Sequence, residues 1–281
     1  MRTEALSGSA AAFPIDSPQI RQETSLKSTK TLVSAPEIIF NNLINLPRLI
    51  VDSGGYIMDR LASEAEHRRL SHDAVFRGEE KLTGDGSPAA ILPGAATWMW
   101  EYDDLLTYLS KSDHPAEAYF PHIVTLGHID IMYEGAKKFV RKKAREFKGK
   151  INLIGHSLGG YFIRKMAYEE PEMLEDCAKR IFIVGAPPGA IVNTAVETFI
   201  MAGHLPFSAR QIEDFVKSIR TLPEKVDIAG IDAYEIESAH DLIVSRQNRR
   251  ARGDVATFDS THRALTRDPD VLRDIVEKLA A

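Results

Sequence analysis

Residues 155–159 read Gly-His-Ser-Leu-Gly and place Ser157 between two glycines, directly after the apolar run 151–154. Glycines at these positions permit a tight turn that would present the serine hydroxyl at its tip. The pattern alone is weak, because with Gly and Ser each at about 7% of residues a chain of this length shows it by chance roughly one time in ten. A serine hydroxyl is also a poor nucleophile unless a base takes its proton. The rest of the chain must therefore supply that base.

A candidate base and a candidate acid follow Ser157 in the chain. His262 lies between an expected strand at 255–258 and the last expected helix, and it is the candidate base. Asp241 follows an expected strand at 233–238, and it would hold the imidazole tautomer and stabilise the imidazolium. The alternatives for the acid are Asp232 and Glu237.

The other histidines suit the role of base less well. His156 lies inside the turn, where we expect it to pack or to support its neighbours. His204 lies in a separate helical segment, and His240 would point away from Asp241 on an extended chain. The remaining histidines precede the serine: His67, His72, His114, His122 and His128.

From residue 88 onward, short apolar runs alternate with amphipathic segments. Strands are expected at 89–93, 122–126, 151–155, 180–187, 233–238 and 255–258. Helices are expected at 98–110, 129–147, 158–170 and 269–280. Continuously apolar strands separated by helices predict an α/β protein with a mostly parallel sheet of about six strands and helices on both faces. Ser157 then lies in a strand–turn–helix unit, where the N–H of Leu158 points into the same space as the serine hydroxyl.

The chain before this region differs in composition. Residues 1–35 are rich in Ser, Thr, Ala and Gln, and they are expected to form a flexible leader. Residues 36–87 are expected to form a helical arm, with at most a short strand near residues 74–78. The first helix of the arm is apolar but carries no Lys or Arg, which favours packing on the core over anchoring at a lipid interface.

The segment from about residue 88 to 281 resembles the α/β-hydrolase superfamily, in its lipase and esterase branch. The matching pieces are ILPGAA, GHSLGG, FIVGAPPG, HDLIV and STHRAL, and the order Ser157, Asp241, His262 is the order of that family. The resemblance implies acyl transfer through a covalent acyl-serine. It also implies an oxyanion hole built from the N–H of Leu158 and an amide after Pro93-Gly94, which is that of Ala95 or alternatively Ala96.

An insertion of about residues 188–225 interrupts the alternation of strands and helices. It is expected to form a small helical cap over the carboxyl ends of the strands, where ligands bind in open α/β sheets. An apolar helix pair there could equally form the interface of a homodimer. Besides Ala96, the residues expected to line the substrate pocket are Trp98, Val196 and Phe199.

Composition bounds the function further. The chain has 281 residues, 44% of them hydrophobic and 27% charged, and a net charge of −5 that favours no nucleic-acid partner. Its single cysteine, Cys177, excludes an internal disulfide, and no histidine spacing typical of a metal site occurs, so no metal or cofactor is expected. No signal peptide or transmembrane run is recognised, and a cytoplasmic location is expected.

These features predict a serine hydrolase that cleaves carboxylic esters or lipids with Ser157, Asp241 and His262. The alternatives are an acyltransferase, a thioesterase or an amidase with the same triad, because all share the acyl-serine. A binding protein on a degenerate hydrolase fold is the alternative from another class. It is disfavoured because all three triad positions are occupied by suitable residues.

Overall fold

The computed structural model describes residues 61–82, 84–94, 99–121, 129–186, 217, 221–223, 225–241 and 255–281. All of these belong to one unit, Asn45–Ala281. Residues 61–70 are helical. The helices that follow are α3 (Ala74–Arg77), η1 (Met99–Tyr102), α4 (Asp103–Lys111), α5 (Ile129–Glu146), α6 (Leu158–Glu169), α7 (Pro171–Cys177), η4 (Ala264–Thr266) and α10 (Pro269–Ala280). The strands are β1 (Ala89–Leu92), β2 (Ala116–Ala118), β3 (Ile151–His156), β4 (Ala178–Val184), β5 (Asp232–Ser238) and β6 (Val255–Phe258).

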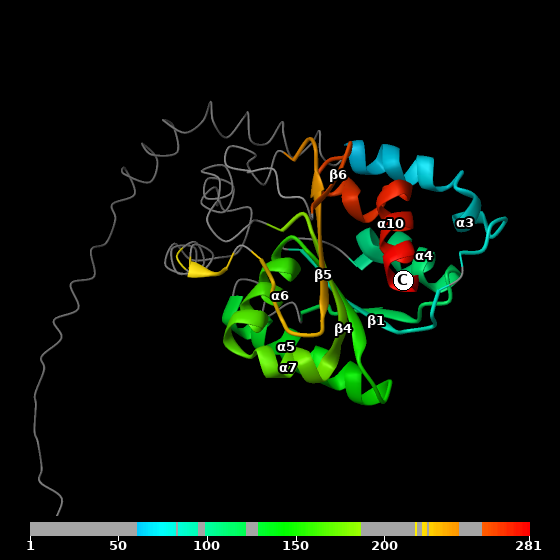
Figure 1. Ribbon diagram of the computed structural model, residues 1–281. Helices are drawn as coiled ribbons and strands as arrows, with labels where there is room; N and C mark the ends of the chain where they lie inside the picture. Colours follow the sequence, from blue (N-terminus) through cyan, green and yellow to red (C-terminus); the bar gives the residue numbers. More distant parts are fainter. Residues whose placement is uncertain are drawn as a thin grey trace, which may run out of the picture. The chain divides into compact units, whose positions relative to one another are not determined.

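The described strands form a six-stranded sheet in the order β2-β1-β3-β4-β5-β6, and every neighbouring pair is parallel (Figure 1). This confirms the predicted α/β class and the predicted size of the sheet. Strand β2 was not expected, because its sequence Ala-Glu-Ala is short and only partly buried. The strand expected at 122–126 lies outside the described residues.

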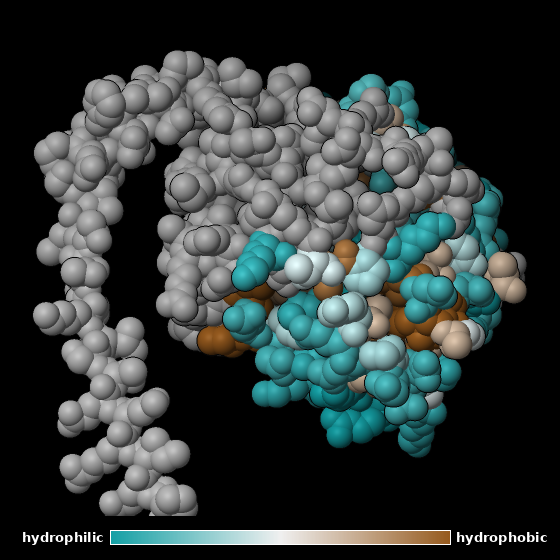
Figure 2. All heavy atoms as spheres, turned by 60° about the vertical axis from the view of Figure 1, so that its left-hand side comes forward, coloured by the Kyte–Doolittle hydropathy of each residue, from teal (hydrophilic) through white to brown (hydrophobic). Residues whose placement is uncertain are grey.

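Helices cover both faces of the sheet (Figure 1). Alternate residues of one strand face opposite layers, because side chains along a strand have a period of two. Thus Ile181 and Ile183 of β4 join the core under α5, α6 and α7, whereas Phe182 and Val184 join the core under α4 and α10. This two-sided burial explains the apolar stretches of β1, β3 and β4, at residues 89–92, 153–155 and 181–184. On the outer face shown in Figure 2 the described residues are mostly hydrophilic.

Local signals fix the ends of two helices. Asp268 caps α10 by accepting a hydrogen bond from the N–H of Asp270, and Pro269 occupies the first turn. Near residues 74–78, where the sequence allowed at most a short strand, the structure has a helix. Residues Ala74–Arg77 form the one-turn helix α3, because the Asp73 side chain accepts from two amides at its start and Gly78 ends it in the left-handed conformation.

The strand order creates a switch point between β1 and β3. The chain leaves β1 toward β2 on one side, whereas it leaves β3 toward β4 on the other. In open parallel sheets the loops after such a pair separate and leave a crevice at the carboxyl ends of the strands. The loop starting at Pro93 and the turn at Ser157 both lie at this point. Among the described residues, no helix is long and apolar enough to cross a membrane.

Candidate active site

Ser157 lies at the junction between β3 and α6. Its backbone has φ 53° and ψ −115°, a conformation that L residues rarely adopt and that costs about 1–3 kcal/mol. Its N–H donates to the carbonyl of Val184 at 2.9 Å, which ties the turn to the end of β4. The Ser157 side chain makes no capping hydrogen bond to α6, so the start of that helix does not hold the hydroxyl.

Small residues around Ser157 are required by close packing. A Cβ on Gly159 would overlap the carbonyl of Leu92, the last residue of β1. A Cβ on Gly155 would lie 2.7 Å from the backbone of Gly159, closer than real Cβ contacts. The start of α6 therefore presses directly on the ends of β1 and β3. This contact is what brings Ser157 beside the loop that begins at Pro93.

Asp241 and His262 are brought together by the structure. The Nδ1 atom of His262 lies 2.9 Å from Oδ2 of Asp241, and both side chains are buried. Because a carboxylate only accepts, Nδ1 carries the hydrogen and Nε2 of the neutral ring is left with a lone pair. The sequence alternatives for the acid lie elsewhere: Asp232 begins β5 at the opposite end of the strand, and Glu237 is within it.

Hydrogen bonds between the loops after β5 and β6 hold this pair. The Ser238 hydroxyl donates to the carbonyl of Ser260, and the N–H of His240 donates to the same carbonyl at 3.2 Å. The His240 side chain itself is exposed and contacts Asp259, so it points away from Asp241. Asp241 directly follows His240, so these bonds to Ser260 fix its position opposite His262.

His262 and Ser157 lie at the same edge of the sheet. A Cβ on Gly185 would lie 3.4 Å from Nδ1 and Cε1 of His262, and Gly185 directly follows the Val184 carbonyl that binds Ser157. The His262 ring also lies beside the ring of His156, with centroids 5.0 Å apart. The three residues of the predicted triad therefore converge on the carboxyl ends of β3 and β4.

The oxyanion and pocket predictions are only partly covered by the structure. Leu158 is the first residue of α6, where backbone N–H groups have no acceptor inside the helix and the helix dipole favours negative charge. Gly94, one residue before the expected amide, is described and buried. The remaining predictions lie outside the described residues: Ala95, Ala96, Trp98, Val196, Phe199 and nearly all of the cap at 188–225.

The sequence did not reveal three polar partners of the site. Tyr102 binds both Gly94 and His156, and the buried pair Glu101–Arg263 joins η1 to the segment after β6. Burial above all, together with repulsion from Arg263 and from His262 once that ring is protonated, lowers the pKa of His156 to about 3, so the His156 ring is neutral. In the sequence, the one indication of these contacts is a tyrosine that follows the predicted oxyanion loop by a few residues.

Comparisons with known proteins agree with this architecture. The structure is similar to a lipase from Bacillus licheniformis, with 11% identity, a TM-score of 0.52, and coverage of 69% of this chain and 92% of that one. It is similar to lipase B from Aspergillus fumigatus, with 12% identity, a TM-score of 0.52, and coverage of 69% and 52%. It also resembles an α/β hydrolase fold protein from Chitinophaga pinensis, with 14% identity, a TM-score of 0.48, and coverage of 71% and 91%.

The chain has the α/β-hydrolase fold. At such identities the likeness concerns the fold alone, and the chemistry must be argued from the residues of this chain. No protein-family model matches the sequence, and a search of curated proteins gives no match either.

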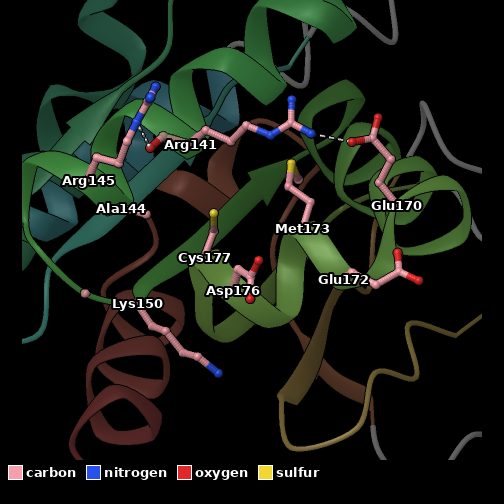
Figure 3. A pocket seen from close by; sticks show the side chains of 10 residues that line it. Arg141, Ala144, Arg145, Lys150, Glu170, Glu172, Met173, Asp176 and Cys177 are labelled. Atoms are coloured by element: carbon pink, nitrogen blue, oxygen red, sulfur yellow. Dashed lines mark hydrogen bonds and ion pairs between the residues drawn. The ribbon is translucent and has the colours of Figure 1, made fainter.

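A separate cavity lies at the opposite edge of this α/β-hydrolase sheet (Figure 3). It has a volume of about 700 Å³ and lies between α5 and α7, beside Lys150 and Cys177, which directly precede β3 and β4. None of the triad residues lines it. Among the described residues, no group of three or more His, Cys, Asp or Glu side chains is placed to hold a metal ion.

Proposed function

We propose that the protein is a serine hydrolase that cleaves carboxylic esters. The observation that carries this proposal is the buried bond of 2.9 Å between Asp241 and His262 at the edge of the sheet where Ser157 stands in a strained turn. A strained residue next to a buried acid–imidazole pair is an arrangement that a purely structural role does not require. The α/β-hydrolase fold supports a hydrolase activity, but the fold alone does not determine the reaction.

Each residue has a separate task in the proposed reaction. The Ser157 hydroxyl attacks the acyl carbon while Nε2 of His262 takes its proton. Asp241 keeps the hydrogen on Nδ1, so that Nε2 is the basic atom, and it stabilises the imidazolium that forms. The Leu158 N–H, with an amide from the Pro93-Gly94 loop, binds the oxyanion of the tetrahedral intermediate.

The second half of the reaction uses the same groups. The imidazolium of His262 returns its proton to the departing alkoxide, which leaves the acyl group on Ser157. Water then attacks the acyl carbon, His262 takes a proton from that water, and the acid is released as Ser157 recovers its hydrogen. An alcohol, thiol or amine in place of water would make the same residues an acyltransferase.

A fluorophosphonate probe and p-nitrophenyl esters of graded chain length test the proposal. The folded wild type should be labelled once and should hydrolyse at least one of the esters. Ser157→Ala should lose both properties, whereas Ser110→Ala, which changes an exposed serine of α4, should keep both. If Ser157→Ala is labelled and turns over like the wild type, the assignment is wrong. Absence of both reactions in the folded wild type would favour a non-catalytic binding role.

The acceptor can be identified in the same assay. Product ratios measured with water alone and with added alcohol or thiol separate hydrolysis from acyl transfer. Predominant release of free acid in the presence of these acceptors is expected. Transfer as the main product would move the protein to the acyltransferases while leaving the roles of Ser157 and His262 unchanged.

A further inference from the structure

A line of buried hydrogen bonds runs from the loop after β1 to the loop that carries His262. The N–H of Gly94 donates to the hydroxyl of Tyr102 at 2.7 Å. That hydroxyl lies 2.8 Å from Nδ1 of His156, and Nε2 of His156 lies 3.1 Å from the backbone carbonyl of His262. The ends of this line are thus the loop expected to supply an oxyanion amide and the residue expected to be the base.

The chemistry of the end groups fixes the direction of every bond. The His262 carbonyl can only accept, so Nε2 of His156 must carry the hydrogen. In the neutral ring Nδ1 is then an acceptor, and the Tyr102 hydroxyl must donate to it. The same hydroxyl oxygen accepts from Gly94. No other assignment satisfies the three groups, and the low pKa of His156 excludes a second hydrogen on its ring near neutral pH.

A second buried contact runs beside this line. Arg263 donates to Glu101 at 2.7 Å, so the neighbours of His262 and Tyr102 along the chain are also joined. The short helix η1, which holds Glu101 and Tyr102, is therefore bonded both to the loop after β1 and to the loop after β6. Tyr102 lies at the centre, because its hydroxyl is the atom through which Gly94 reaches His156.

We propose that Tyr102 is a positioning residue of the active site, which acts through His156 to set the place of the Gly94 loop relative to His262. The inference rests on the proposed function. Oxyanion donors stabilise the transition state only when they point at the position that the oxyanion will occupy. A misplacement of about 1 Å can cost up to roughly 100-fold in rate. Loss of the Tyr102 hydroxyl removes its bond to the Gly94 amide and removes the donor to Nδ1 of His156.

Tyr102→Phe tests this role with a matched control in the same part of the chain. Tyr108, in α4, is equally buried, but its hydroxyl has no hydrogen-bond partner among the described residues. Tyr102→Phe should lower kcat about 10- to 100-fold and leave KM within about twofold, because oxyanion contacts act in the transition state. Tyr108→Phe should leave both within about twofold. A kcat like that of the wild type in folded Tyr102→Phe, even with a lower Tm, would overturn the inference.

A double-mutant cycle asks whether Tyr102 acts through His156. If it does, Tyr102→Phe in the His156→Leu background should lower kcat by less than about twofold, since the line is already broken. A full additional loss would show that Tyr102 acts without His156 and would contradict the proposal. Should His156→Leu fail to fold, the comparison of Tyr102→Phe with Tyr108→Phe decides alone.

Ser157→Ala, measured in parallel, distinguishes failure of the positioning role of Tyr102 from failure of the proposed function. Inactive Ser157→Ala together with fully active Tyr102→Phe would remove the positioning role and leave the hydrolase proposal intact. Active Ser157→Ala, or an inactive wild type, would remove the proposed function and the positioning role with it.

Discussion

At the carboxyl edge of the sheet, Asp241 and His262 are buried and bonded to each other, whereas at the amino edge Arg141 and Glu170 pair at the surface. The carboxyl edge also holds the left-handed backbone of Ser157, while the cavity at the amino edge is lined by ordinary helix residues of α5 and α7. Both edges carry ionisable groups and one nucleophile each, which is the Ser157 hydroxyl at the carboxyl edge and the Cys177 thiol at the amino edge. They differ in how firmly those groups are placed.

The difference shows what placement contributes. The Arg141–Glu170 pair is partly exposed to water, so it contributes only about 0–1 kcal/mol, and Glu170 also pairs with the buried Lys137. The two groups of a buried acid–imidazole pair cannot exchange their mutual hydrogen bond for one to water. The carboxylate therefore fixes which imidazole nitrogen is basic. At the amino edge, burial raises the pKa of the Cys177 thiol, which makes this nucleophile weaker. Of the four predictions that follow, three compare the two edges, and one compares a buried with an exposed histidine at the carboxyl edge.

Asp241→Asn should have the largest effect. An amide at this position can offer its N–H to Nδ1, which favours the tautomer with the hydrogen on Nε2 and removes the base. We expect kcat to fall about 10⁴-fold with little change in Tm. Asp176→Asn, at the cavity of the amino edge, should keep kcat within about twofold. Equal losses in the two variants would abolish the distinction between the edges.

Gly159→Ala should be the most destabilising of the small substitutions. Its Cβ would overlap the Leu92 carbonyl, and backbone on both sides leaves little room to relax, so we expect a loss of about 3 kcal/mol or more in the free energy of unfolding. Gly149→Ala at the amino edge meets nothing within 4 Å and should change that free energy by less than about 1 kcal/mol. Urea unfolding of both variants gives the comparison, and similar midpoints would contradict it.

His156 should make the protein less stable as the pH falls. Its pKa is about 3 in the folded state and 6.5 as the ordinary value, so between these values the unfolded chain binds more protons and unfolding becomes easier. Between pH 7 and pH 5 this contributes about 2 kcal/mol of lost stability. His156→Gln should remove that part of the pH dependence in urea titrations. His240→Gln, which changes an exposed imidazole, should retain it.

Much of the fold follows from local sequence. Strands β1, β3 and β4 are predictable because each contains a buried apolar stretch, at residues 89–92, 153–155 and 181–184. Strand β2 is not, because three partly exposed residues at a sheet edge carry no period and owe their conformation to pairing with β1. The separate helix α7 was also missed, since only Pro171 marks the break after α6.

The residues of the candidate site likewise divide into those that the sequence predicts and those that it does not. Ser157 has a local signature, and the order of Asp241 and His262 after successive strands suggests where their side chains meet. Tyr102 has no such signature. Its contact with His156 depends on how η1 lies against the end of β3, a tertiary relation between residues 54 positions apart. Hydrophobic periodicity does not predict such contacts, because it describes only the spacing of residues within one helix or strand.

Cys177 gives the smallest expected effect and the most direct test of the amino edge. It is the single cysteine, 8% exposed, and Cys177→Ala should change kcat by less than about twofold because the cavity that it lines is remote from Ser157. Because the thiol is buried and burial raises its pKa, Ellman's reagent at pH 8 should react more slowly with the folded protein than with the protein in urea. One thiol should react in urea. Rapid reaction of the folded protein, or loss of ester turnover on modification, would mean that the amino edge takes part in the chemistry after all.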